Sequence, residues 1–348
     1  MKNTLFFLVA AAAAFFTAGC ANNSASAHNT TDSSAAGATT TNASNNQPAA
    51  PATPTLDTAA YNRLLQHMSN GDTTGKWPVK SAYPLPGAIL PFNRIIAYYG
   101  NLYSTRMGAL GEFPKKEMFR RLQDEVAKWT AADSVMPAIP ALHYIAITAQ
   151  MEPGKAGKYR LRMPFSQIDT IVSWAKEIDA LVFIDIQVGL STLQQEMPEF
   201  EKYLAMPNVH FGIDPEFSMK GGQRPGTVIG TFDAADINYA TGYLADIVKK
   251  YNLPPKILVV HRFTGPMVTN TKNIQLRPEV QIVMDMDGWG IPAKKINTYY
   301  QFIYPQPVQF TGFKIFYNND TKRSNWPVVM EPKEVLGLTP KPVYIQYQ

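Results

Sequence analysis

Short apolar runs recur along most of the chain, and several of them end on acidic or histidine residues. The plainest are LVFIDIQ (181–187), VHFGIDPE (209–216), KILVVH (256–261) and VQIVMDMD (280–287). Runs of this length, rich in Val and Ile, are typical of buried strands. In α/β folds the chemistry lies where parallel strands end, so polar residues confined to the last positions of such runs predict a shared site.

Segments with the apolar spacing of amphipathic helices alternate with these runs. We expect strands at 94–100, within 136–147, and at 180–188, 208–217, 256–263, 280–287, 313–317 and 343–347. Helices are expected at 61–68, 114–131, 166–178, 193–205, 234–251 and 292–302. Eight strands separated mostly by helices predict a single (β/α)8 TIM barrel over residues 58–348.

A doubly wound open sheet is the alternative fold, but no G-x-G-x-x-G or P-loop sequence follows any of the runs. The last predicted strand reaches residue 347, close to the end of the sequence, so one outer helix position of the barrel has no obvious occupant. We expect the helix at 61–68 to fold back and cover it.

The N-terminal residues have the features of a secretion signal. Lys2 precedes an apolar run at 5–16, and Thr17, Ala18 and Gly19 then lead to Cys20. This segment resembles a bacterial lipobox, with Thr17 where an aliphatic residue is commoner. The resemblance implies a signal peptide at 1–20 and a palmitate-type lipid anchor on Cys20 that holds the protein to a membrane on the extracytoplasmic side of the cell envelope. An ordinary secretory signal with an incidental cysteine is the alternative.

Composition narrows the range of functions further. Residues 21–57 are nearly all Ala, Ser, Thr, Asn and Pro, which predicts a disordered tether. Cys20 is the single cysteine, so the chain has no internal disulfide and no multi-cysteine metal cluster. The formal net charge is only +5, and no basic stripe interleaved with aromatic residues indicates nucleic acid. Nothing in the pattern indicates a protein partner.

Alternation along the strands predicts which polar side chains face the barrel axis. The catalytic candidates that it places there are Asp185, Asp214, Glu216, His261, Asp285 and Asp287. The candidates for substrate contacts are Tyr99, Asn101, Gln187, Trp289 and Tyr317. Structural roles are the alternatives: backbone acceptors or turn residues for the acids, a hydrogen-bonded barrel residue for His261, and a loop anchor for Trp289.

Several carboxyl groups brought together must raise the pKa of at least one of them or bind a cation. The first outcome gives the acid and carboxylate pair of a glycosidase, which needs no cofactor. The second outcome would hold Mg²⁺ or Ca²⁺ and suit a metal-dependent phosphodiesterase.

Two of the strand ends resemble glycoside hydrolases that have a barrel fold. GIDPEF (212–217) is similar to the last part of the family 18 chitinase motif, and VMDMDG (283–288) resembles that family's sixth strand. Gly212 and Val209 stand where the motif has further aspartates. The chain as a whole also resembles uncharacterised bacterial lipoproteins with a glycosidase-like barrel. These resemblances imply that Glu216 is an acid at the end of the fourth strand.

The sequence therefore favours a lipid-anchored hydrolase that acts on a glycan outside the cytoplasm. Glu216 would be the general acid/base, and Asp285 or Asp214 the second carboxylate. A metal-dependent phosphodiesterase and a glycan-binding lipoprotein without turnover are the alternatives. The substrate, and the choice between retaining and inverting chemistry, stay open.

Overall fold

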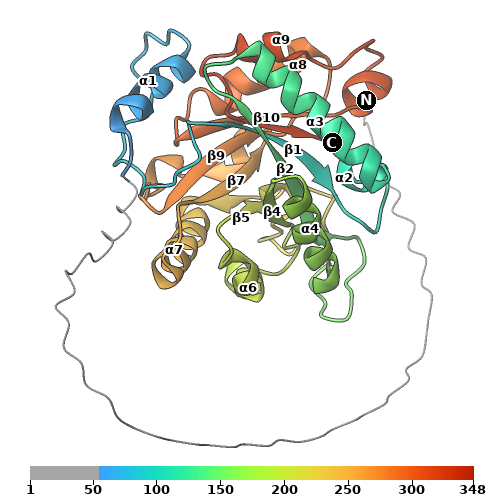
Figure 1. Cartoon of the computed structure of the whole chain (residues 1–348). Coiled ribbons are helices and arrows are strands. Elements are labelled where there is room, and N and C mark those ends of the chain that lie inside the picture. The colour runs from blue at the N-terminus through green and yellow to red at the C-terminus, as the bar shows by residue number, and fades with distance from the viewer. Residues whose placement is uncertain (1–54) are drawn as a thin grey trace, which may run out of the picture. The chain divides into compact units, whose positions relative to one another are not determined.

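Eight parallel strands close into a barrel in the computed structural model, which describes residues 55–348 (Figure 1). β1 pairs with β2 on one side and with β11 on the other, which closes the ring. The expected signal peptide, Cys20 and nearly all of the expected tether lie outside the described residues. The eight strands are β1 (Arg94–Gly100), β2 (Ala138–Ala149), β4 (Leu181–Ile186), β5 (Val209–Ile213), β7 (Lys256–Arg262), β9 (Val280–Met286), β10 (Phe310–Ile315) and β11 (Tyr344–Tyr347). The predicted TIM barrel is confirmed.

Three short strands lie outside the barrel. β3 (Arg160–Arg162) pairs antiparallel with the end of β2, while β6 (Phe232–Asp233) and β8 (Val268–Thr269) pair with each other. Helices surround the barrel in Figure 1. They are α1 (Thr58–Ser69), α2 (Ala109–Glu112), α3 (Lys115–Ala132), α4 (Phe165–Glu177), α5 (Leu193–Glu196), α6 (Glu201–Leu204), α7 (Ala234–Tyr251), α8 (Pro292–Thr298) and α9 (Pro332–Leu336). Within residues 55–348 no helix has the length and apolar character needed to cross a membrane.

The helix expected at 193–205 is interrupted, and a 3-10 turn at Met197–Phe200 separates α5 from α6. Pro198 lies in this turn. Because proline cannot donate a backbone hydrogen bond, it does not continue a regular helix. By contrast, α7 has the bounds that the sequence predicted, because Asp233 caps its first turn and Asn252 ends it in the left-handed conformation.

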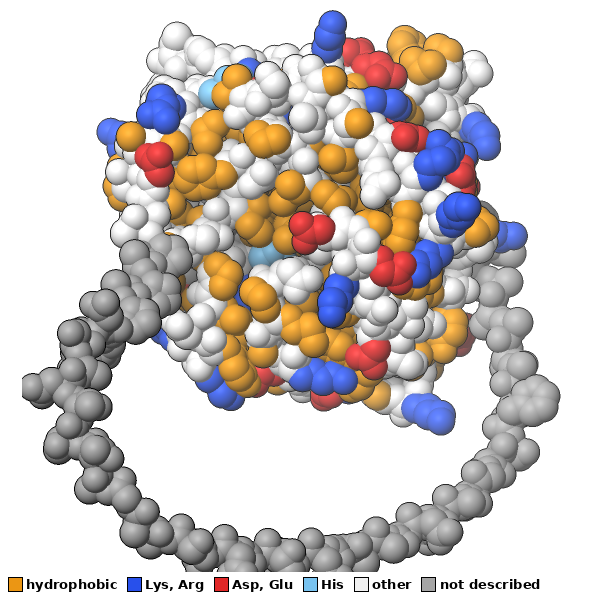
Figure 2. All heavy atoms as spheres, in the orientation of Figure 1, with side chains coloured by type: hydrophobic (Ala, Val, Ile, Leu, Met, Phe, Trp, Pro, Cys, Tyr) orange, Lys and Arg blue, Asp and Glu red, His pale blue; other side chains and the backbone are white. Residues whose placement is uncertain are grey.

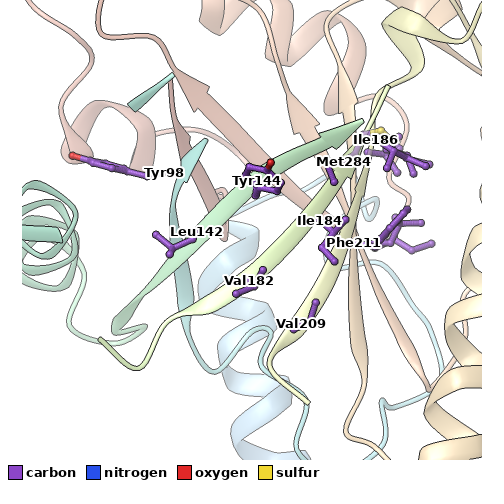
Figure 3. Close-up of a cluster of buried hydrophobic side chains, with 14 of the residues drawn as sticks. Tyr98, Leu142, Tyr144, Val182, Ile184, Ile186, Val209, Phe211 and Met284 are labelled. Atoms are coloured by element: carbon purple, nitrogen blue, oxygen red, sulfur yellow. The ribbon is translucent and has the colours of Figure 1, made fainter. Parts of the chain in front are cut away.

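Every second side chain of the barrel strands packs outward against the helices. Figure 3 shows part of this layer, including Val182, Ile184 and Ile186 of β4 and Val209 and Phe211 of β5. All of these side chains are completely buried. Their burial on the outer face fixes the register of each strand, so the alternate residues must face the barrel axis.

α1 does not occupy the missing outer helix position, so that expectation was wrong. The backbone N–H of Lys341 donates to the carbonyl of Met68, and Met68 packs into the cluster inside the barrel with Ile95. α1 therefore closes the end of the barrel from which the strands start. α3 reaches the last strand at one point, where Trp129 donates from Nε1 to the hydroxyl of Tyr347 over 2.9 Å.

Lys and Arg side chains are interspersed with Asp and Glu on the face seen in Figure 2, and hydrophobic side chains gather toward its middle. No broad basic patch stands out on this face. The view agrees with a modest net charge of +5 over the whole sequence.

Candidate active site

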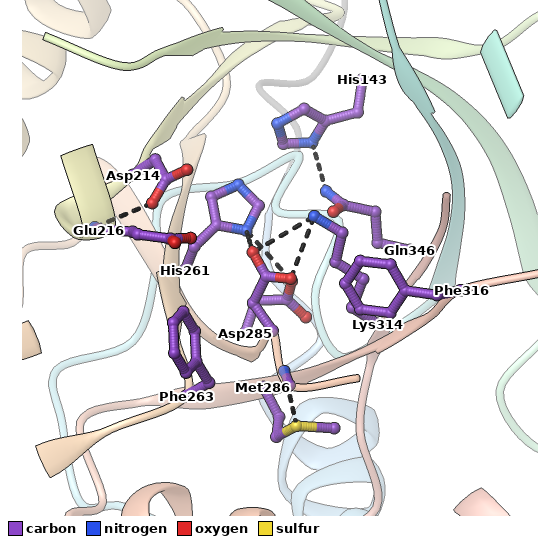
Figure 4. Close-up of polar contacts among 12 residues, drawn as sticks. His143, Asp214, Glu216, His261, Phe263, Asp285, Met286, Lys314, Phe316 and Gln346 are labelled. Carbon is purple, nitrogen blue, oxygen red and sulfur yellow. Dashed lines mark hydrogen bonds and ion pairs between the residues drawn. The ribbon is translucent and has the colours of Figure 1, made fainter. Parts of the chain in front are cut away.

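Inward-facing side chains at the ends of the strands form a buried polar network, part of which is shown in Figure 4. β4 supplies Asp185, β7 supplies His261, and β9 supplies Asp285 and leads into Asp287. These are faces that the strand alternation predicted. The sequence prediction missed four further members of the network, which come from β2, β10 and β11: His143, Lys314, Tyr344 and Gln346.

The centre of the network is a carboxylate shared by two histidines. Nε2 of His143 and Nε2 of His261 each lie 2.6 Å from Oδ2 of Asp185. All three side chains are completely buried. Because a carboxylate only accepts, both histidines must carry a proton on Nε2.

The other ring nitrogens of the two histidines face different surroundings. Nδ1 of His143 lies 2.5 Å from the hydroxyl of Tyr344 and 3.3 Å from Nε2 of Gln346. Gln346 also donates to the Tyr344 hydroxyl over 3.0 Å, which leaves the tyrosine proton for His143. Nδ1 of His143 therefore accepts, and this ring is the neutral tautomer.

Nδ1 of His261 faces carboxylates instead. It lies 3.2 Å from Oδ2 of Asp287 and 3.4 Å from Oδ2 of Asp285. An unprotonated nitrogen here would place its lone pair against those of the carboxylate oxygens. We infer that His261 is doubly protonated, so the two histidines on Asp185 carry different charges.

The pKa shifts have the directions that this arrangement requires. Burial lowers the pKa of His143 to about 4. Burial also opposes the charge of His261, but the Asp185 carboxylate outweighs it and raises the pKa of His261 well above its usual range. Burial likewise opposes ionisation of Asp185, yet the charge of His261 and the hydrogen bonds from both histidines hold the pKa of that carboxyl well below its usual range.

Asp285 and Asp287 differ in their exposure and in the direction of their pKa shifts. Asp285 is completely buried, and burial raises its pKa although the nearby His261 opposes the shift. The side chain of Asp287 is 10% exposed and its Oδ1 lies 3.1 Å from Nζ of Lys314. Burial would raise the pKa of Asp287, but the charges of Lys314 and His261 lower it.

Asp214 and Glu216 lie at the end of β5, joined by a short turn. Oδ1 of Asp214 accepts from the backbone N–H of Glu216 over 3.0 Å, and its Oδ2 accepts from Nε2 of Gln187 over 3.2 Å. Burial raises the pKa of Asp214 to about 7. Burial, together with the charges of Asp214 and Asp287, raises the pKa of the partly exposed Glu216 to about 8.

The candidates for substrate contacts have separate positions. The ring of Tyr99 lies inside the network, 3.9 Å below Nζ of Lys314. Asn101 is buried and donates to the carbonyl of Ile145, so it joins the ends of β1 and β2. Trp289 is partly exposed, with Nζ of Lys294 4.7 Å from its ring.

Tyr317 does not lie near the carboxylates of the polar network. Its hydroxyl contacts that of Tyr98 over 3.0 Å and Oε1 of Glu125 over 3.4 Å. Its ring also stacks on Tyr347. These partners place the side chain against α3 on the outer face of the barrel.

Two glycines make room for the network. A Cβ atom on Gly212 would lie 2.7 Å from Nε2 of His143 and 2.8 Å from Oδ2 of Asp185. A Cβ atom on Gly312 would lie 2.4 Å from Oδ1 of Asp285. Gly212, which departs from the chitinase motif, is therefore required here by the neighbouring histidine and carboxylate.

His143, Asp185 and His261 are also the one group of described residues whose nitrogen and oxygen atoms converge as metal ligands would, within 4.8 Å of one another. They do not fit a cation as they stand. Both Nε2 atoms donate to Asp185, so their lone pairs are unavailable, and Mg²⁺ or Ca²⁺ prefers oxygen ligands. In addition, Asp185 and Asp287 already have His261 and Lys314 as partners.

Comparison with known proteins assigns no family to this chain. No family model matches the chain, and no curated protein matches its sequence. A solved structure of a trimodular endoglucanase of the GH5_4 subfamily is similar over 75% of this chain, with 10% sequence identity and a TM-score of 0.43. The similar region spans 56% of that endoglucanase chain. A likeness at this level says nothing of activity, and the barrel assignment rests on the strand pairing above.

Proposed function

We propose that the protein is a glycoside hydrolase that uses Glu216 and Asp287 as its working pair. The observation that carries the proposal is the opposite effect of the site on these two carboxyl groups. The pKa of Glu216 is raised to about 8 by burial and by neighbouring carboxylates. The pKa of Asp287 is lowered, because Lys314 and His261 outweigh its burial. Two carboxyl groups with opposite shifts are the pattern that separates an acid from a carboxylate.

Glu216 would donate its proton to the glycosidic oxygen as the bond to the anomeric carbon breaks. Asp287 would stabilise the positive charge that develops on that carbon, and then either bond to it or activate a water. Asp287 suits this role better than Asp285 or Asp214. Asp285 is completely buried, and both oxygens of Asp214 accept hydrogen bonds within the protein.

The buried network would serve this pair by fixing its charges. His261 is held by Asp185 and lies 3.2 Å from Asp287, so its positive charge keeps Asp287 ionised. Lys314 acts on Asp287 from 3.1 Å away. Both cations are buried, and charges interact more strongly there than in water.

The test is a screen of glycosides and polysaccharides with the full chain and three variants. We expect Glu216→Gln and Asp287→Asn each to lower turnover about 10²- to 10⁴-fold, the usual contribution of a positioned acid or base. Asp246→Asn, an exposed carboxylate on α7, is the matched control and should leave turnover unchanged. Turnover that survives Glu216→Gln would refute the proposal. If a chelator abolished activity and Mg²⁺ restored it, a metal-dependent phosphodiesterase would be favoured. If the protein bound glycans without hydrolysing them, a glycan-binding lipoprotein would be favoured.

We further propose that the enzyme is anchored to a membrane through a lipid on Cys20 and acts outside the cytoplasm. The support is the resemblance of residues 17–20 to a lipobox after an apolar run. Labelling of cells with a fatty-acid analogue should mark the wild-type protein and not Cys20→Ala. A variant that is still labelled and stays with the membranes would contradict the proposal.

A further inference from the structure

The side chain of Tyr99 points into the barrel near the end of β1. Along this strand Ile96 and Tyr98 pack in the outer layer, whereas Ile95 and Ala97 belong to the cluster inside the barrel. Because successive side chains alternate between the two faces of a strand, Tyr99 faces the barrel axis. Only 3% of the residue is exposed. Its ring is therefore part of the interior that holds the polar network.

Three members of the network surround the ring of Tyr99. Its centre lies 5.3 Å from that of His143 and 5.8 Å from that of His261, and Nζ of Lys314 lies 3.9 Å from it. A cation at this distance attracts an aromatic face. The same ammonium group lies 3.1 Å from Oδ1 of Asp287. Lys314 thus links the ring to the ionised carboxylate of the proposed working pair.

The hydroxyl of Tyr99 has no hydrogen-bond partner within residues 55–348. Its neighbours in the network do have partners, since Lys314 pairs with Asp287 and the hydroxyl of Tyr344 contacts His143. The small exposed part of Tyr99 includes the hydroxyl oxygen. A polar group in a nearly buried position costs free energy unless it is hydrogen-bonded. This hydroxyl is therefore available to a molecule that enters the site.

The surroundings of the Tyr99 hydroxyl keep it protonated. Burial, and after it the carboxyl groups of Asp185, Asp214, Asp287 and Glu216, raise the pKa of Tyr99 well above its usual range. A protonated phenol can donate a hydrogen bond, which an ionised carboxylate cannot do. The electrostatic influence of Glu216 and Asp287 also shows that both members of the working pair act on this one group.

We propose that Tyr99 is a further catalytic residue, whose hydroxyl donates a hydrogen bond to an oxygen of the sugar that is cleaved from its neighbour. The inference rests on the proposed function, which places this sugar between Glu216 and Asp287. Sugar oxygens need donors as well as acceptors, and hydrogen bonds close to the anomeric carbon strengthen in the transition state. Because the ring itself is nearly buried, Tyr99 acts through its hydroxyl and not as a stacking surface.

Tyr99→Phe tests the contact, because it keeps the ring and removes only the hydroxyl. On a glycoside that the wild type hydrolyses we expect kcat/KM to fall about 10- to 100-fold, between the effects of an ordinary hydrogen bond and of a preorganised donor. Both limbs of the pH profile should stay in place, because a direct contact with the sugar leaves the charges of Glu216 and Asp287 unchanged. An unchanged kcat/KM would overturn the inference, and so would a shifted limb, which would mean that Tyr99 only tunes the pair.

Iminosugars test the same contact without turnover. They carry the hydroxyl groups of a sugar and a basic nitrogen within the ring. We would titrate a panel of piperidine and pyrrolidine iminosugars into the wild type and Tyr99→Phe by calorimetry. The dissociation constants of those that bind should rise about three- to tenfold in the variant, as expected for one lost hydrogen bond. Equal constants, or no binding to the wild type, would overturn the inference. The proposed function fails separately, through turnover that survives Glu216→Gln.

Tyr98→Phe is the matched control. Tyr98 precedes Tyr99 on β1 but faces outward, is completely buried, and has its hydroxyl 3.0 Å from that of Tyr317. Its variant should lower the midpoint of urea denaturation and leave kcat/KM and iminosugar binding unchanged. Tyr99→Phe should leave the midpoint unchanged or raise it, because no bond within the described part of the protein is lost. A clear loss of stability in Tyr99→Phe would show that the hydroxyl is bound within the protein, which would also overturn the inference.

Discussion

His143 and His261 donate to the same atom, Oδ2 of Asp185, and yet carry different charges. The difference follows from their other nitrogens. Nδ1 of His143 faces donors, while Nδ1 of His261 faces carboxylates. One buried carboxylate thus orients a neutral ring and neutralises a charged one, and the charged ring faces Asp287, whose side chain is 10% exposed.

The charge states of the two histidines can be measured directly. Across pH 5 to 8 we expect ¹⁵N NMR of labelled imidazoles to show His261 protonated on both nitrogens and His143 only on Nε2. The pKa of His261 is raised well above its usual range, mainly by Asp185 against burial, and burial lowers that of His143 to about 4. A neutral His261 at pH 7 would contradict the assignment.

Gly212 and Gly312 should not tolerate a side chain. We expect Gly212→Ala and Gly312→Ala each to lower the free energy of unfolding by about 1–3 kcal/mol, because an added methyl group forces a packed interior to shift. The new Cβ atoms would lie 2.7 Å from His143 and 2.4 Å from Asp285. Urea denaturation measures the effect.

Gly242 on α7 provides the matched control. The nearest atom to an added Cβ there is 3.9 Å away, and the position is helical. Gly242→Ala should leave stability unchanged or raise it by about 0.5–1 kcal/mol, since alanine favours a helix. Equal changes in stability at all three positions would show that Gly212 and Gly312 are not needed to leave space for the network.

The strands could be predicted because the barrel buries both of their faces. A strand such as β9 is then an apolar run that acidic residues interrupt only near its end. The alternation of side chains along the strands correctly predicted that Asp185 and Asp285 face inward, because the outward-facing residues are packed under helices. The expected position of α1 was wrong, because sequence periodicity shows that a helix is amphipathic and not which surface it covers.

His143 and Lys314 escaped prediction for a different reason. Each follows an apolar residue within its strand and precedes another, Leu142 and Tyr144 for the first and Phe313 and Ile315 for the second. A single polar residue inside an apolar strand was the available signal, since its only place is the barrel axis. The contacts of His143 with Asp185 and of Lys314 with Asp287 join different strands, so no local pattern reveals them.

The pH dependence of activity should follow the ionisation of the two working carboxyl groups, Glu216 and Asp287. Glu216 must be protonated, so activity should fall as pH rises through about 8. Asp287 must be ionised, and because the cations around it lower its pKa, activity should fall only in strong acid. Lys314→Met removes one of those cations, which raises the pKa of Asp287 and moves the acidic limb of kcat/KM to higher pH.

The control for this profile is Lys272→Met, an exposed lysine in the turn Thr271–Asn273. It should leave both limbs in place. An acidic limb that Lys314→Met does not move would exclude Asp287 as the ionised partner, while leaving Glu216 as the acid.

Asp133 should be the most sensitive carboxylate at the opposite end of the barrel. It lies 3.0 Å from the guanidinium of the completely buried Arg94 and 2.9 Å from His67 of α1. Asp133→Ala leaves the Arg94 charge buried without its partner, so we expect the free energy of unfolding to fall by about 3–5 kcal/mol. Asp124→Ala breaks an exposed pair with Arg120 and should cost less than about 1 kcal/mol. Urea denaturation compares the two, and similar losses would mean that Arg94 keeps its charge satisfied through backbone carbonyls alone.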